Sequence, residues 1–135
     1  MEARKACLDT TFLIDHLRGL PNAVNKAAEL KDAGCDLCTT SINAFELYVG
    51  ATRSHLPRSF AALEGLLADI RILNLGKDEA QESASIMADL MRRGRMIEMR
   101  DALIAGCMIR NACTTILTRN ARDFARITEL EVIEY

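Results

Sequence analysis

Four acidic side chains lie far apart in this sequence, each within or beside an apolar run. They are Asp9, Glu46, Asp101 and Asp123. A buried charge is costly unless a cation or strong hydrogen-bond donors meet it, so carboxylates in apolar surroundings require an explanation. Carboxylate oxygens are the ligands that hard divalent cations prefer. The four acids are therefore candidate ligands for Mg²⁺ or Mn²⁺.

Glu46 lies within a helical stretch whose neighbouring positions on the same face are apolar. Ile42 precedes it by four residues and Val49 follows it by three, which places all three on one side of a helix. Gly50, one turn further on, removes side-chain bulk and would let a ligand or another backbone approach. We therefore expect a carboxylate in a stripe that otherwise faces the core.

Three of the acids also have an ordinary structural explanation. Asp9 could cap the helix that follows it, Asp101 could complement its helix dipole, and Glu46 could pair with a buried arginine. What is unusual is that all of them are expected at one edge of a sheet. The carboxyl ends of parallel strands meet at such an edge, where α/β folds bind their ligands.

Short apolar strands alternate with helical segments along the chain. Strands are expected at residues 5–9, 36–40, 70–75, 114–118 and 131–134. Helices are expected at residues 10–17, 21–32, 41–52 and 58–69, from residue 78, and from about residue 100. Because no hairpin signal separates the strands, helical crossovers and a parallel sheet are predicted. The expected fold is α/β, a three-layer sandwich with a central parallel sheet of about five strands, in a single domain of residues 1–135.

Composition is consistent with a protein that stays out of membranes. Half of the 135 residues are hydrophobic, enough for a core without disulfides or a structural metal. No apolar run reaches the ~18 residues that a membrane-spanning helix needs. The charged N-terminal segment lacks the apolar stretch of a signal peptide. We expect a cytoplasmic protein.

Cys35 and Cys38 have the C-x-x-C spacing of some zinc and redox sites. A zinc site would need a second ligand pair, and the two histidines are not paired in sequence. A redox motif would open a helix, whereas Cys38 lies in an expected strand. We therefore expect two separate thiols.

Charge is distributed unevenly along the chain. The net charge of −2 argues against a protein that coats nucleic acid. Between Arg92 and Arg126, however, there are eight arginines and only three acids. A basic rim beside an acidic pocket suits a substrate with a phosphate backbone, and an ordinary solvated arginine face is the alternative.

Taken together, these motifs resemble those of PIN-domain ribonucleases, in particular the VapC type of toxin from toxin–antitoxin pairs. The resemblance spans essentially the whole chain and rests on four segments. They read LDTTFLID (8–15), SINAFELYVG (41–50), DALIAG (101–106) and ILTRNARDF (116–124). The resemblance implies a parallel sheet with strand order 3-2-1-4-5.

By this resemblance, Asp9, Glu46 and Asp101 match the family acids that hold Mg²⁺ or Mn²⁺. At the fourth position many relatives have an acid directly after the strand, where this chain has Asn120. Others place it three residues later, as Asp123 would here. We take Asp123 as the fourth acid and Asn120 as a second polar contact.

Four further residues complete the expected site and its surroundings. Glu98 is a candidate for the pocket rim, and the hydroxyls of Thr10 and Thr118 are expected to orient a ligand or water. Asp15 is expected on the helix surface rather than among the ligands.

The activity implied is metal-dependent hydrolysis of RNA phosphodiester bonds by an endoribonuclease, the toxin of a VapBC-type pair. Its partners would be RNA, a small antitoxin that places an arginine or lysine among the acids, and a second copy of the chain. The homodimer is expected to use apolar helix faces, namely Phe60, Leu63, Leu67, Met87, Leu90 and Met91.

Two alternatives compete with this hypothesis. A catalytically inactive PIN-like module could bind RNA or protein without cleaving it. A phosphoacceptor signalling domain also gathers acids at a sheet edge, but it needs adjacent acids after the first strand and a lysine after the last. Here Asp9 is followed by Thr10 and Thr11, and no lysine follows Lys77, so the signalling domain is disfavoured.

Overall fold

The computed structural model describes residues 3–54 and 56–135. Met1 and Glu2, which begin the segment in which no signal peptide is expected, lie outside the described residues. The five strands form one sheet of order β3-β2-β1-β4-β5 in which every neighbouring pair is parallel. They are β1 (Lys5–Leu8), β2 (Asp36–Thr40), β3 (Arg71–Leu73), β4 (Thr115–Leu117) and β5 (Glu131–Ile133). The predicted parallel sheet and its strand order are confirmed.

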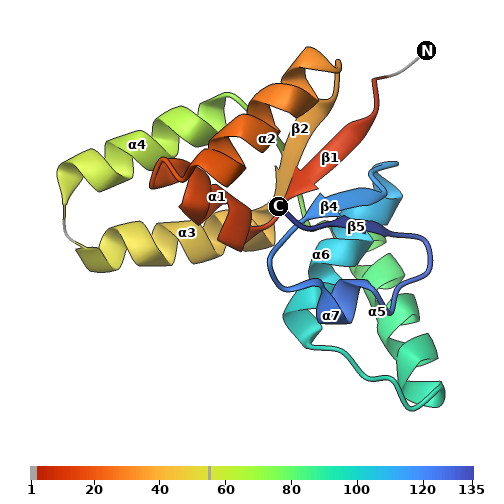
Figure 1. Cartoon of the computed structure of the whole chain (residues 1–135). Helices are drawn as coiled ribbons and strands as arrows, with labels where there is room; N and C mark the ends of the chain where they lie inside the picture. Colours follow the sequence, from red (N-terminus) through yellow and green to blue (C-terminus); the bar gives the residue numbers. More distant parts are fainter. Residues whose placement is uncertain (1–2, 55) are drawn as a thin grey trace.

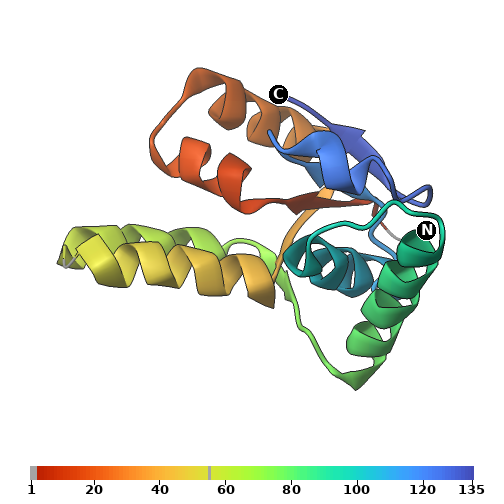
Figure 2. The ribbon, with the colours of Figure 1, turned by 90° about the horizontal axis from the view of Figure 1, so that it is seen from below.

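Helices cover both faces of this sheet (Figures 1 and 2). They are α1 (Thr10–Leu17), α2 (Pro21–Asp32), α3 (Ser41–Ser54), α4 (Pro57–Ala68), α5 (Lys77–Arg92), α6 (Met99–Arg110) and α7 (Ala121–Phe124). The six expected helices are confirmed, with shifts of a few residues at their ends. Helix α7 was not expected, because one helical turn is too short to show a hydrophobic period.

Alternating side chains along the strands separate two apolar cores. Cys7 and Ile116 point to the side of α5 and α6, where they pack with Ile104 and Met108. Ala6, Leu8 and Leu117 point to the opposite side and pack with residues of α1, α2 and α4. This alternation follows from the two-residue period of a strand. Since both faces are buried, apolar residues occupy consecutive positions of the central strands, as in residues 6–8 of β1 and 116–117 of β4.

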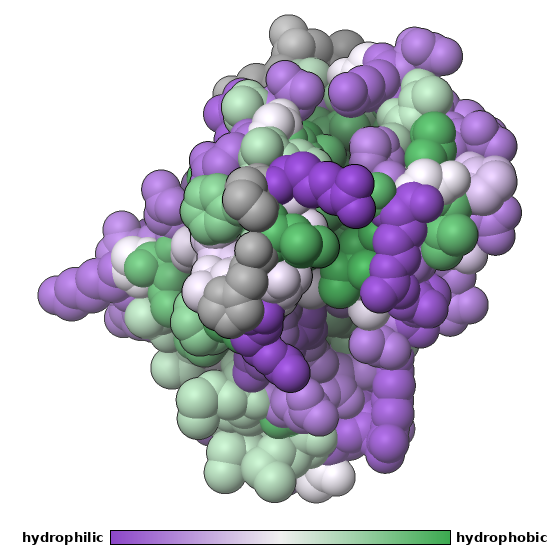
Figure 3. Space-filling model, turned by 90° about the vertical axis from the view of Figure 1, so that its left-hand side faces the viewer, coloured by the Kyte–Doolittle hydropathy of each residue, from purple (hydrophilic) through white to green (hydrophobic). Residues whose placement is uncertain are grey.

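Helices α3 and α4 pack against each other and project from the sheet (Figure 1). Hydrophilic and hydrophobic residues are interspersed over this end of the molecule (Figure 3). Three residues expected at a dimer interface, Leu63, Leu67 and Leu90, are buried within the monomer. Those faces are therefore largely used by the monomer's own core, and Phe60 and Met91 remain exposed. The homodimer itself stays a prediction.

The five cysteines are all free, as expected, and four of them are buried. Cys38 lies within β2 rather than at a helix N-terminus, which agrees with two separate thiols. Burial raises the pKa of Cys107 to about 11 and so keeps its thiol protonated. Among the described helices, none has the length and hydrophobicity needed to cross a bilayer.

Candidate metal centre

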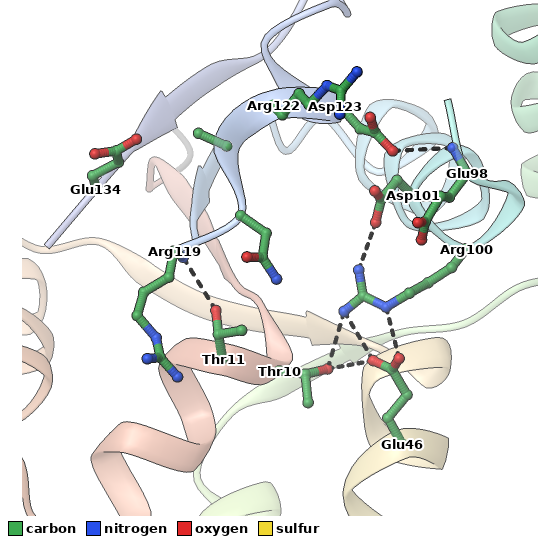
Figure 4. A pocket seen from close by; sticks show the side chains of 12 residues that line it. Thr10, Thr11, Glu46, Glu98, Arg100, Asp101, Arg119, Arg122, Asp123 and Glu134 are labelled. Carbon is green, nitrogen blue, oxygen red and sulfur yellow. Dashed lines mark hydrogen bonds and ion pairs between the residues drawn. The ribbon is translucent and has the colours of Figure 1, made fainter. Parts of the chain in front are cut away.

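The carboxyl ends of β1, β2 and β4 meet at one edge of the sheet, and a pocket lies above them. Asp9 directly follows β1, Thr118 follows β4, and α3 begins immediately after β2. The pocket is lined by residues from these junctions and from α6, including Thr10, Glu46, Arg100, Asp101, Asn120 and Asp123 (Figure 4). The parallel sheet therefore brings together the acids that the sequence singled out.

Asp9 is completely buried and is held by uncharged donors on two sides. The amide of Asn43 donates to its Oδ1 at 2.8 Å, and the hydroxyl of Thr118 donates to its Oδ2 at 2.6 Å. Asp9 occupies the N-cap position of α1, but its side chain makes no capping hydrogen bond. The carboxylate contacts Asn43, Thr118 and Arg100 instead, so helix capping does not explain this residue.

Glu46 approaches the pocket from α3, with its side chain 31% exposed. The hydroxyl of Thr10 donates to its Oε1 at 2.5 Å. Val49, expected to share a core-directed stripe with Glu46, is 43% exposed, so that expectation is wrong. This face of α3 lies at the end of the sheet rather than over it, and therefore borders the pocket and solvent.

The guanidinium of Arg100 lies in the middle of the acids (Figure 4). Its Nε donates to Glu46 Oε2 at 2.6 Å, and its Nη1 donates to Asp101 Oδ1 at 2.5 Å. Its Nη2 lies 2.8 Å from Asp9 Oδ1 and 2.9 Å from Glu46 Oε1. Burial alone would lower the pKa of Arg100, but the hydrogen bonds and charges of Glu46 and Asp9 raise it. One cation thus joins three carboxylates from three separate elements.

The sequence did not reveal this role of Arg100, which was counted only among the arginines of the basic rim. The cation that we expected from an antitoxin is supplied here by the chain itself. The available signal was its position, since it directly precedes Asp101 in the first turn of α6. Sequence spacing alone does not show whether such a side chain turns toward the acids or toward solvent.

Asp101 belongs to a second group of acids on the other side of the pocket. Oxygens of Glu98, Asp101 and Asp123 all lie within 4.8 Å of one another. Burial, together with the neighbouring Asp123, raises the pKa of Asp101 to about 7, although Arg100 opposes the shift. Burial works against ionisation of Asp123 as well, but the Glu98 backbone N–H, which donates at 3.0 Å, helps to lower its pKa.

Asp123 and Asn120, the two residues considered for the fourth position of the site, occupy different places in the pocket. Asp123 lies on α7 beside Asp101. Asn120 is exposed, and its backbone N–H donates to the Thr118 hydroxyl at 2.9 Å. Because Thr118 in turn donates to Asp9, Asn120 contributes to holding Asp9 through its backbone.

Asp15 does not lie on the surface as expected. It is 3% exposed, it accepts a hydrogen bond from Tyr135 Oη at 2.6 Å, and it forms an ion pair with Arg119 Nε at 3.0 Å. Tyr135 also packs edge-on against the ring of Phe12. The expectation was wrong because the end of the chain folds back over α1, a long-range contact that local sequence does not indicate.

Asn43 is a buried site residue to which the sequence assigned no role. Its amide donates to Asp9 and, at 3.0 Å, to the Thr10 hydroxyl. Its Oδ1 accepts from the backbone N–H and the hydroxyl of Thr40, at 3.2 and 2.6 Å. The signal available was an asparagine in the first turn of α3, a helix that begins directly after Thr39 and Thr40.

The donor chemistry of the pocket fits a divalent cation. Asp9, Glu46, Asp101, Glu98 and Asp123 offer only oxygen atoms, as Mg²⁺ and Mn²⁺ prefer. The guanidinium among three of them shows that a positive charge can be accommodated there. Arg100 pairs with three of these acids, and Glu98 and Asp123 lie beside Asp101, so five carboxylates are concentrated at this edge of the sheet.

Comparisons with known proteins find relatives that match nearly the whole chain. Residues 6–130 match the family described as PIN domain. The chain is 31% identical to the tRNA(fMet)-specific endonuclease VapC of Shigella flexneri, covering 97% of this chain and 98% of that protein. It is 31% identical to ribonuclease VapC2 of Haemophilus influenzae, covering 93% and 94%. It superposes on a chain of the DNA-bound VapBC structure from Salmonella typhimurium with a TM-score of 0.82, 28% identity and coverage of 97% and 98%.

Proposed function

The chain belongs to the PIN-domain family, and we propose that it is a metal-dependent endoribonuclease acting as the toxin of a VapBC-type toxin–antitoxin pair. The observation that carries the proposal is that Asp9, Glu46 and Asp101 converge at the carboxyl ends of parallel strands. All three contact the same positive group, the guanidinium of Arg100. Curated relatives named as ribonucleases support the same activity.

We assign Asp9, Glu46 and Asp101 as metal ligands, with Asp123 as the fourth acid. Glu98 and Asn120 border this set. Bound Mg²⁺ or Mn²⁺ would lower the pKa of a bound water and stabilise the charge that develops on the phosphate.

The surrounding hydroxyls and amide give the ligands fixed positions. Thr118 and Asn43 each hold one oxygen of Asp9, and Thr10 holds one oxygen of Glu46. Side chains already fixed by hydrogen bonds lose little freedom when a ligand binds, which favours both affinity and correct orientation. We therefore assign Thr10, Thr118 and Asn43 supporting roles.

The substrate side of the pocket carries exposed arginines. Arg119 and Arg122 line the pocket together with the acids. Guanidinium groups bind phosphate oxygens through paired hydrogen bonds. We propose that these two side chains hold the RNA backbone beside the scissile phosphate.

The relatives suggest where to look for the substrate and the partners. Because two of them are named tRNA(fMet)-specific endonucleases, we propose initiator tRNA as the first substrate to examine, and the cytoplasm as the place of action. Because VapBC complexes share this fold, we also propose a small antitoxin as partner. A homodimer of the toxin remains part of the proposal.

Cleavage of RNA by the purified protein tests the proposal. We expect Mn²⁺ or Mg²⁺ to support cleavage of total RNA and of initiator tRNA, and excess EDTA to abolish it. Co-expression of a small protein encoded beside the toxin gene should relieve growth inhibition. Binding of RNA without any cleavage in Mn²⁺ would favour the inactive module instead.

A further inference from the structure

Of the groups that donate hydrogen bonds to the Asp9 carboxylate, Arg100 is the one that a metal ion could replace. The described hydrogen-bond partners of the Asp9 carboxylate are Asn43, Thr118 and Arg100. Asn43 and Thr118 are fully buried, whereas the Arg100 side chain is 26% exposed. Among these three donors, only Arg100 is charged, and only it can leave without exposing a buried polar group. A cation that binds Asp9 must therefore take the place of Arg100.

The same conclusion follows from the other two carboxylates. Both Glu46 oxygens accept hydrogen bonds from the guanidinium, and so does Oδ1 of Asp101. A guanidinium and a divalent cation repel each other at such distances, most strongly where water is scarce. The arginine in this position and a metal held by these three acids exclude one another.

A path for the displaced side chain lies next to the site. Arg100 borders a second, largely apolar pocket lined by Ile42, Phe45, Leu75 and Met99. A long arginine stem can lie along apolar surface while its charged end reaches water. Arg100 can therefore leave the acids by turning its side chain, without movement of α6.

We propose that Arg100 is an internal counter-ion that competes with the metal for Asp9, Glu46 and Asp101. It neutralises the acids while the metal is absent and is displaced when the metal binds. This inference rests on the proposed metal centre. Arg100 thus sets the metal concentration at which the nuclease becomes active, and metal binding and release of the arginine are reciprocally linked.

Calorimetric titration of the full chain with Mn²⁺ tests this competition. Arg100→Gln removes the competing charge, and we expect it to bind Mn²⁺ at least about tenfold more tightly than wild type, within the range typical of coupled equilibria. In EDTA the variant should melt at a lower temperature than wild type, because the carboxylates then repel one another. Mn²⁺ should raise its melting temperature by more than it raises that of wild type.

Arg122→Gln is the matched control. Arg122 lines the same pocket but does not take part in the described ion pairs with the three acids. Arg122→Gln removes the same charge from the pocket as Arg100→Gln does. Its effect on Mn²⁺ affinity therefore measures the contribution of charge without direct contact, and we expect the affinity to change by no more than about threefold. If Arg100→Gln does not fold, Arg100→Lys takes its place, since lysine loses the forked contact and should show an intermediate gain in affinity.

The outcomes separate this inference from the proposed function. If wild type binds Mn²⁺ and Arg100→Gln binds it equally or less tightly, Arg100 positions the acids rather than competing with metal. The inference is then overturned and the metal centre stands. If neither protein binds Mn²⁺, both are overturned.

Discussion

Helix α6 meets opposite demands at its start and in its middle. At its start, Arg100 and Asp101 border a pocket in which several carboxylates lie close together. In its middle, Gly106 packs so closely against α5 that an added Cβ would lie 1.8 Å from Ser83 Oγ. In the first region negative charge is concentrated where a ligand could bind, and in the second there is no room for a side chain.

The contrast shows which property each region serves. Like charges held close together destabilise the folded state, and a bound cation would remove this repulsion. The start of the helix is therefore arranged for function rather than for stability. Close packing without voids or strain stabilises the fold whatever the protein does. Substitutions at the start of α6 should therefore alter activity more than stability, and those in its middle the reverse.

The largest effect is expected in the pocket at the start of α6, which Glu46 of α3 also lines. Glu46→Gln keeps the size of the side chain and its hydrogen bond with Thr10, but removes one negative charge from the acids. We expect metal-dependent RNA cleavage to fall at least ~100-fold, the scale of losing one well-placed electrostatic group. Cleavage rates and melting temperature should be measured together. Glu64→Gln, on the exposed side of α4, is the control and should cleave like wild type.

Gly106→Ala should have the opposite effect, lowering stability while leaving activity intact. The added methyl group would also lie 2.7 Å from the Glu79 carbonyl oxygen and from the Ser83 nitrogen. Because backbone atoms cannot move aside easily, we expect a loss of about 2–3 kcal/mol in the free energy of unfolding. Urea denaturation measures it, and cleavage per folded molecule should be retained.

Gly65→Ala is the matched control for that substitution. Gly65 also lies within a helix, but a Cβ there would meet no atom within 4 Å. Alanine is the better helix former, so stability should rise by up to ~1 kcal/mol. Equal losses at both glycines would show that close packing of α5 on α6 is not the cause.

Substitution of Asn43 should affect both stability and metal binding, because this buried residue positions the proposed metal ligand Asp9. Asn43→Ala leaves Asp9, Thr10 and Thr40 without one hydrogen-bond partner each, and we expect a loss of about 1–2 kcal/mol in the free energy of unfolding. Mn²⁺ affinity should fall as well, since Asp9 loses its orientation. Denaturation in EDTA and calorimetry measure the two effects. Asn74→Ala, at an exposed position, should change neither.

A smaller effect is expected from pH in the metal-free protein. The pKa of Asp101 is raised to about 7 from an ordinary value of 3.8. The folded state therefore holds this proton more tightly than the unfolded state does, and stability should decrease as the pH rises from about 4 to about 7. Melting temperatures in EDTA across this range test it. Asp123→Asn removes the neighbouring charge and should flatten the curve; an unchanged curve would show that Asp123 is not responsible.

Much of the fold and the acid set could be predicted from sequence. The strands and main helices follow from the hydrophobic period, which is a local property of the sequence. Once the strands are parallel, the carboxyl end of β1 must lie beside those of its neighbours. Asp9, Glu46 and Asp101 could therefore be grouped before their positions were known.

The features that escaped prediction depend on contacts between distant segments. Arg100 reaches Asp9 across 91 positions of the chain, and Tyr135 reaches Asp15 across 120. Neither contact leaves a local pattern, because one side chain can point in several directions from the same backbone. Asn43 lay in a segment of interest, but only its burial shows that it holds Asp9.

The central claim is that the acids at the sheet edge form a catalytic metal centre, and Asp101→Asn tests it most directly. At pH 8, in one preparation, both melting temperature in EDTA and Mn²⁺-dependent RNA cleavage should be measured. We predict cleavage reduced at least ~100-fold, with a melting temperature equal to or above that of wild type because repulsion with Asp123 is relieved. Cleavage near the wild-type rate, with a lowered melting temperature, would make Asp101 a structural residue and contradict the account.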